Sequence, residues 1–153
     1  MGLGSGLIMD YQISGYTRTR LQWSGRFSVG INELDMQHQR LISLINRLIL
    51  VSETRSIHSE IIKSALEDMT EYAQVHFKAE EKLMEAYGFP SLKEHKKSHL
   101  DFQVKTMDLY EGKGQSAEQI ADDISNYLGN WLTHHILQED MAYKDFFIDK
   151  GLR

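Results

Sequence analysis

Several of the seven histidines in the chain lie at spacings that suit metal binding. Glu80 follows His76 by four residues, and His99 follows His95 by four residues. Positions i and i+4 of an α-helix lie only about 40° apart around its axis, so each pair would present two side chains on one face. Imidazole nitrogens and carboxylate oxygens bind transition metals well, and both pairs therefore predict metal ligands.

Further candidate ligands lie outside these two pairs. His38 stands alone, whereas His134 and His135 are adjacent and are followed by Glu139 and Asp140. On an ideal helix Glu139 shares the face of His135, but Asp140, five residues on, lies about 140° round the axis. Helical geometry alone therefore favours Glu139 over Asp140, and it leaves His134 and His135 as rivals.

A buried cluster of five histidines and two carboxylates would need partners for its polar atoms. Each unsatisfied buried group costs ~1–3 kcal/mol, which is large beside the ~5–15 kcal/mol stability of a domain. A metal centre would satisfy these atoms, and seven ligands are too many for one ion, so two ions are predicted. Iron, zinc, copper and nickel all accept such ligands. The excess of neutral histidine favours reversible chemistry over strong oxidation of a substrate.

Four long segments with helical periodicity would position these side chains. Glycine, proline and a capping box delimit them, with Ser116 and Gln119 forming the box. The expected helices cover about 35–52, about 56–87, the stretch from just after Pro90 to just before Gly112, and the stretch from Ser116 to Gly151. Short connections place successive helices antiparallel, so the expected fold is all-α, an up-down-up-down four-helix bundle.

The N-terminal part of the chain differs from the rest. Residues 1–22 have no helical period and are expected to form an extended arm, while residues 23–153 form the bundle domain. Alternation of period two is not sustained anywhere, so no sheet is expected.

Composition excludes several classes of protein. The chain has 153 residues and a net charge of −5, which argues against nucleic-acid binding. It has no apolar run long enough to span a membrane and no basic start typical of a signal peptide, so a cytoplasmic location is expected. Cysteine is absent, which excludes thiolate metal sites and iron–sulfur clusters.

Four stretches, taken in order, resemble the motifs of the hemerythrin family. They are Trp23 with Val29-Gly30-Ile31, Asp35-Met36-Gln37-His38 and Leu41; His76-Phe77-Lys78-Ala79-Glu80-Glu81; His95-Lys96-Lys97-Ser98-His99 with Phe102; and Trp131-Leu132-Thr133-His134-His135-Ile136 with Asp140. Each stretch alone is weak evidence, but their order makes the resemblance specific over roughly Trp23 to Phe147.

The resemblance implies a ligand set of seven residues. One iron would be held by His95, His99 and His135 and the other by His38 and His76, with Glu80, Asp140 and a hydroxide or oxide bridging the two ions. It selects His135 and Asp140 over their rivals, and either a local widening of the helix or a ligand that reaches in from the flank would reconcile their spacing. It also implies that dioxygen binds as peroxide at the five-coordinate iron, beside an apolar wall of Leu41, Phe77, Trp131, Leu132 and Ile136.

The expected function is reversible dioxygen binding, for carriage, storage or delivery, and not catalysis. An alternative is an oxygen or redox sensor acting through a separate partner. An enzyme, such as a di-iron oxidase or peroxidase, and a plain bundle holding zinc or nothing are weaker readings. A single histidine on a helix is more often a hydrogen-bonded boundary residue than a ligand. We accordingly expect His58, His134, Glu81, Asp122 and Asp123 on the solvated surface.

Overall fold

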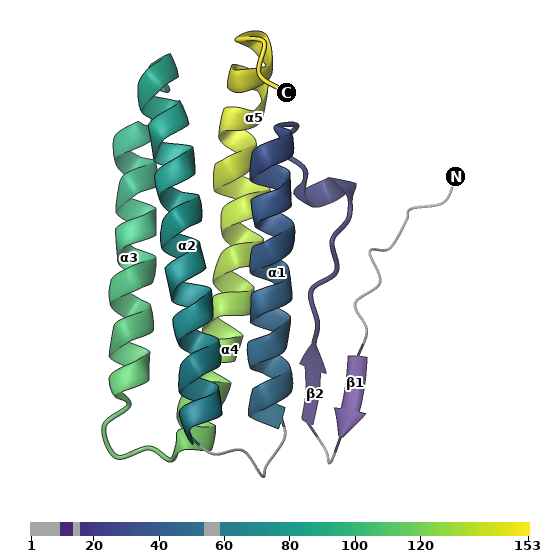
Figure 1. Cartoon of the computed structure of the whole chain (residues 1–153), viewed down its shortest axis with the longest axis vertical. Coiled ribbons are helices and arrows are strands. Elements are labelled where there is room, and N and C mark those ends of the chain that lie inside the picture. Colours follow the sequence, from purple (N-terminus) through teal and green to yellow (C-terminus); the bar gives the residue numbers. More distant parts are fainter. Residues whose placement is uncertain (1–9, 14–15, 54–58) are drawn as a thin grey trace.

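Four antiparallel helical rods form a bundle in the computed structural model, which describes residues 10–13, 16–53 and 59–153 (Figure 1). The first three rods are α1 (Asn32–Glu53), α2 (Ser59–Tyr87) and α3 (Leu92–Glu111). The fourth is composite, with α4 (Ala117–His134), a π-helical turn η2 (His135–Asp140) and α5 (Met141–Asp149). Contacts run from α1 to α2, α2 to α3, α3 to α4 and α4 to α1, which confirms the predicted up-down-up-down bundle.

The ends of the helices follow the local chemistry expected from the sequence. Ser116 caps α4 through its hydroxyl, which accepts from the Gln119 N–H, and the side-chain oxygen of Gln119 accepts from the Ser116 N–H. At the end of α2, Gly88 has a φ of 71°, and the Phe89 N–H reaches back to the Met84 carbonyl at 2.8 Å. A glycine in this left-handed conformation ends a helix with its last carbonyls satisfied.

Two short strands precede the bundle, so the prediction of no sheet is wrong. β1 (Asp10–Ile13) pairs antiparallel with β2 (Tyr16–Thr19), and the pair lies beside α1 (Figure 1). Four-residue strands are too short to give a clear period of two, although Ser14-Gly15 between them is a typical hairpin sequence.

The chain between the hairpin and the bundle is held against α1. Asn46 accepts from the Leu21 N–H at 2.9 Å and donates to the Leu21 carbonyl at 2.7 Å. Arg20 reaches Glu53 at 2.7 Å. The short helix η1 (Gly25–Phe27) then leads into α1.

The core consists of two apolar clusters with a polar layer between them. Along α1, buried Leu34 belongs to one cluster and Leu41 to the other, and buried His38 lies between them. The same order recurs on α2, where Glu80 separates Phe77 from Met84. The expected ligands therefore occupy a layer that hydrocarbon covers on both sides.

Two apolar residues of α2 lie outside the core. Ile61 and Tyr87 are exposed, whereas Ile62 is buried. Among the described residues, no helix combines the length and apolar character needed to cross a membrane. The cytoplasmic location stays a prediction.

Candidate metal centre

The structure brings all seven expected ligands into the polar layer. They fall into two sets that share Glu80, and within each set one ligand atom per residue lies within 4.8 Å of the others. The sets are Glu80 with His95, His99 and His135, and Glu80 with His38, His76 and Asp140. All seven side chains are buried, so the layer is closed to bulk solvent.

Asp140 faces both sets, with one carboxylate oxygen toward each. Its Oδ1 lies 3.0 Å from Nε2 of His135 and 3.2 Å from Nε2 of His95. Its Oδ2 lies 3.1 Å from Nε2 of His38. Asp140 is thus placed to bridge two ions.

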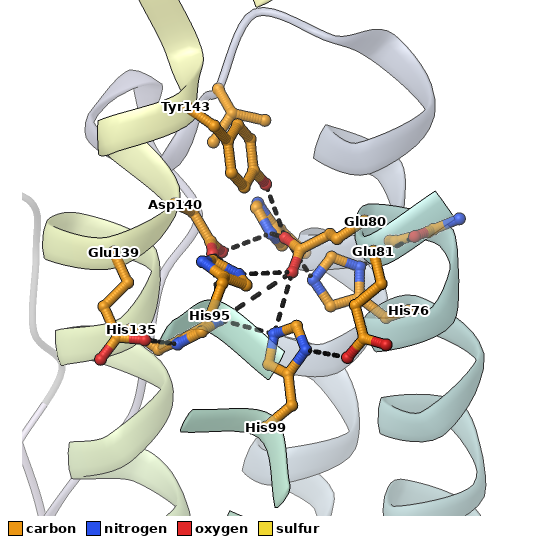
Figure 2. Close-up of polar contacts among 12 residues, drawn as sticks. His76, Glu80, Glu81, His95, His99, His135, Glu139, Asp140 and Tyr143 are labelled. Atoms are coloured by element: carbon orange, nitrogen blue, oxygen red, sulfur yellow. Dashed lines mark hydrogen bonds and ion pairs between the residues drawn. The ribbon is translucent and has the colours of Figure 1, made fainter. Parts of the chain in front are cut away.

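Glu80 likewise directs one carboxylate oxygen toward each set (Figure 2). Its Oε1 lies 3.0 Å from Nε2 of His76 and 3.4 Å from Nε2 of His38. Its Oε2 lies 3.2 Å from Nε2 of both His95 and His99. Two carboxylates that each direct one oxygen to either group of imidazoles are suited to bridge a pair of metal ions.

Several of these converging atoms have no hydrogen-bond partner. Among the described residues, Nε2 of His38, Nε2 of His76 and both carboxylate oxygens of Asp140 are buried and make no hydrogen bond of good geometry, although each lies at ion-pair distance from another member of the cluster. Buried polar atoms are normally hydrogen-bonded, so atoms that converge without hydrogen bonds suggest a shared ligand between them. Nitrogen and carboxylate donors fit iron and similar transition metals, and the residues therefore suit a metal pair.

The π-helical turn explains the ligand spacing on the fourth rod. Its hydrogen bonds join residues five apart, so His135 and Asp140, its first and last residues, both point inward. Of the two ways to reconcile the spacing, the local widening is the one present. Glu139, which ideal geometry favoured, instead binds the outer nitrogen Nδ1 of His135 at 2.7 Å, and His134 is exposed as expected.

An outer shell of hydrogen bonds orients three of the rings. Each pairs the Nδ1 of a ligand with a side-chain oxygen: His76 with Gln37 at 2.8 Å, His99 with Glu81 at 2.7 Å, and His135 with Glu139 at 2.7 Å (Figure 2). Donation from Nδ1–H fixes the tautomer in which Nε2 offers its lone pair inward.

This shell was missed in the sequence, and the expectation that Glu81 is a solvated surface residue is wrong. Gln37, Glu81 and Glu139 each stand next to a ligand in the chain, which is the signal that could have identified them. His58 lies outside the described residues. Asp123 is exposed as expected, whereas Asp122 is half-buried.

Tyr143 is a further participant that the sequence did not reveal. Its ring is buried, and its hydroxyl donates to Oε1 of Glu80 at 2.6 Å (Figure 2). Burial and the negative charges of Asp140 and Glu80 raise the pKa of Tyr143 well above its ordinary value, which keeps the hydroxyl protonated as a donor. A tyrosine one turn beyond a ligand looks like ordinary core in a sequence.

In the metal-free cluster, protons on the imidazoles balance the negative charges of the carboxylates. Burial would lower the pKa of His38, but the carboxylates of Asp140 and Glu80 outweigh it and raise that pKa to about 9. The pKa of His95 is raised to about 9 by the same balance of causes. Burial and Glu80 would raise the pKa of Asp140, yet His135 and His38 hold it below its ordinary value. Metal ions would displace these imidazole protons.

The five residues expected to form the apolar wall lie in or against a single core cluster. Leu41, Phe77, Leu132 and Ile136 are buried in it, and half-buried Trp131 packs against it. The Phe77 ring stacks on His99 with centroids 3.9 Å apart, and Trp131 stacks on His135 at 4.3 Å.

Comparisons with known proteins agree with this geometry. A family model described as the hemerythrin HHE cation binding domain matches residues 29–147. The chain belongs to the hemerythrin family. Its relatives include a bacteriohemerythrin of Stenotrophomonas maltophilia, 34% identical over 125 residues that cover 82% of this chain and 80% of that protein. A hemerythrin-like protein of Naegleria gruberi is 34% identical over 122 residues, which cover 80% of this chain and 89% of that protein.

A solved structure extends the likeness to the fold. A crystal structure of a hemerythrin mutant superposes with a TM-score of 0.71 at 23% identity, covering 82% of this chain and 95% of that one. The hemerythrin bundle is therefore the fold of this chain.

Proposed function

We propose that this hemerythrin-family chain binds dioxygen reversibly at a pair of non-haem iron ions, serving oxygen carriage, storage or delivery. The observation that carries the proposal is the division of Glu80 and Asp140, which each direct one oxygen to either set of imidazoles. Membership of the hemerythrin family supports dioxygen as the ligand.

The two sets of ligands are unequal. His95, His99 and His135 would hold one ion, and only His38 and His76 would hold the other, with Glu80 and Asp140 shared. The second position therefore has one protein ligand fewer, and we place dioxygen binding there. When bound, a pair of ferrous ions supplies the two electrons that dioxygen takes up on binding. Gln37 holds the His76 ring so that its lone pair faces that position.

The protein's other contribution is to keep water and large molecules away. The ligands are buried, and apolar clusters lie above and below them. Phe77 and Trp131 cover ligand rings directly. A dry site of this kind slows loss of bound oxygen and unwanted oxidation. Its closure supports a diatomic ligand over an organic substrate, and we propose binding without turnover.

The test compares two adjacent histidines in one experiment. The chain is loaded with iron under anaerobic conditions, its iron content is measured, and oxygen is added and removed while the visible spectrum is recorded. We expect two irons per chain and an oxygen-dependent band that disappears on deoxygenation. His135→Ala should lose iron and the band, whereas His134→Ala, a change at an exposed position, should keep both.

Three results would count against the proposal. Fewer than two irons per chain would contradict the metal pair. A visible spectrum of the iron-loaded protein that does not change with oxygen would contradict the oxygen-binding function. Turnover of peroxide or nitric oxide well above that of free iron would replace binding with catalysis.

A further inference from the structure

The helix α3 carries apolar side chains on its outer face as well as its inner one. Its inner face holds the buried residues His95, His99, Phe102 and Thr106. On the outer face, Leu100, Val104 and Met107 are 57%, 52% and 66% exposed. Three large apolar side chains this exposed on one helix form a face with no partner among the described residues of the chain.

These three residues belong to a longer regular series. Successive steps of four and three residues join Lys93, Lys97, Leu100, Val104, Met107 and Glu111, all of them exposed; we call this series the outer stripe. Alternating steps of four and three are the spacing of a coiled-coil seam. The stripe is apolar in its middle, basic at its start and acidic at its end.

We propose that the outer stripe is the contact between two copies of this chain, whose α3 helices pack antiparallel about a two-fold axis. An interface of this kind is self-complementary, since each copy offers the same surface. Antiparallel packing sets Lys93 of each copy against Glu111 of the other, so the favourable pair occurs twice. Parallel packing would set Lys93 against Lys93 and Glu111 against Glu111, which repel.

The same register also matches the apolar residues. With Lys93 opposite Glu111, Leu100 of one copy lies opposite Val104 of the other. Lys97 then lies opposite Met107, and its aliphatic stem can cover the thioether while its ammonium stays in water. The seam runs along a helix of 20 residues, about 30 Å, which is long enough for a sequence of such layers.

Val75 is an exposed apolar side chain that does not belong to a comparable seam. Val75 on α2 is 57% exposed, about as much as Val104, but exposed Glu71 and Lys78 stand four residues before it and three residues after it. At the same two offsets Val104 has the apolar residues Leu100 and Met107, so charge interrupts the apolar line through Val75 and not the one through Val104. It is therefore a matched control for Val104.

The first experiment measures the mass of the iron-loaded full chain by analytical ultracentrifugation at concentrations from about 1 µM to 1 mM. We expect the mass to rise from 17.7 kDa toward twice that value. Val104→Glu should weaken association at least about tenfold, since it places two charges at the centre of the contact. Val75→Glu should leave association unchanged. Glutamate is a good helix former, so both variants should fold.

A charge exchange then tests the antiparallel register. Lys93→Glu and Glu111→Lys should each weaken association about threefold to tenfold, because each creates two like-charged pairs. The double variant should restore the original affinity. A chain that stays monomeric throughout, or association insensitive to Val104→Glu, would overturn the proposal. Failure of the double variant to recover would overturn the antiparallel register.

Discussion

The outer-shell partners of the ligand histidines differ in charge. Glu81 and Glu139 place carboxylates against rings of the three-histidine set, whereas Gln37 places a neutral amide against His76 of the other set. A carboxylate that accepts the Nδ1 proton makes an imidazole a stronger donor to metal than an amide does. A metal ion held by His95, His99 and His135 would therefore be stabilised at a higher charge. A metal ion held by His38 and His76 would receive less electron density from its ligands.

Glu81→Gln tests this difference at one atom. The change keeps the side-chain size and the hydrogen bond but removes the charge beside His99. We expect the affinity for one of the two irons to fall about 10-fold or more, the lower end of the usual effect of an outer-shell change. Competition with a chelator under anaerobic conditions measures it. Glu85→Gln, one turn further along α2 and exposed, is the control, and equal affinities in the two variants would contradict the expectation.

The raised pKa values of His38 and His95 predict how the metal-free protein responds to pH. Both rise from 6.5 to about 9 in the folded state, so the folded state holds protons more tightly than the unfolded chain. Their stabilising contribution is complete below pH 6.5 and is lost as pH rises through about 9.

Chemical denaturation of the metal-free protein at several pH values between these limits measures this effect. We expect the free energy of unfolding to fall across the window. The iron-loaded protein is the control, because its imidazoles have exchanged protons for metal and should show a flatter profile. If the free energy of unfolding of the metal-free protein increased between pH 6.5 and about 9, the raised pKa values of His38 and His95 would be contradicted.

At the scale of the helices, Gly112 shows how tightly α3 is joined to α4. It ends α3 with a φ of 30°, and a Cβ at this position would lie 2.4 Å from Cγ1 of Ile120. Gly112→Ala should therefore destabilise the metal-free protein by more than about 1 kcal/mol, from backbone strain and the clash together.

Gly129→Ala provides the opposite case for comparison. Gly129 lies within α4, and a Cβ there would meet nothing within 4 Å. Alanine should stabilise the protein by about 0.4–1 kcal/mol through its smaller loss of backbone freedom. Denaturant unfolding curves for the two variants should move in opposite directions, and a shift in the same direction would refute this account.

Much of the bundle could be predicted because its signals are local. The capping box at Ser116 and the glycine at Gly88 act within a few residues, and the i,i+4 ligand pairs need only one helix. The His135 to Asp140 spacing indicated either a widened turn or a ligand that reaches in from the flank, and ideal geometry favoured Glu139. The contact between Glu81 on α2 and His99 on α3 left a weaker signal, only the position of Glu81 next to the ligand Glu80, and for this reason Glu81 looked like a surface acid.

At the scale of the whole molecule, the metal layer crosses all four rods. His38 comes from α1, His76 and Glu80 from α2, His95 and His99 from α3, and His135 and Asp140 from η2. Metal ions bound in this layer would link the four rods to one another. The β1–β2 hairpin contributes no ligand and lies beside α1, outside this linkage.

Removal of iron should therefore loosen the bundle as a unit. A ligand at 1,000 times its dissociation constant stabilises the state that binds it by about 4 kcal/mol, which for a chain of this size corresponds to roughly 8–16 °C in melting temperature. We expect a fall of at least that size on chelation, because two ions are lost. Hydrogen exchange should show amides of α1, α2, α3 and α4 losing protection together, while the hairpin amides stay unchanged. Loss confined to the fourth rod would mean that the ions are not shared across the bundle, since only a joint site couples helices whose sequences lie far apart.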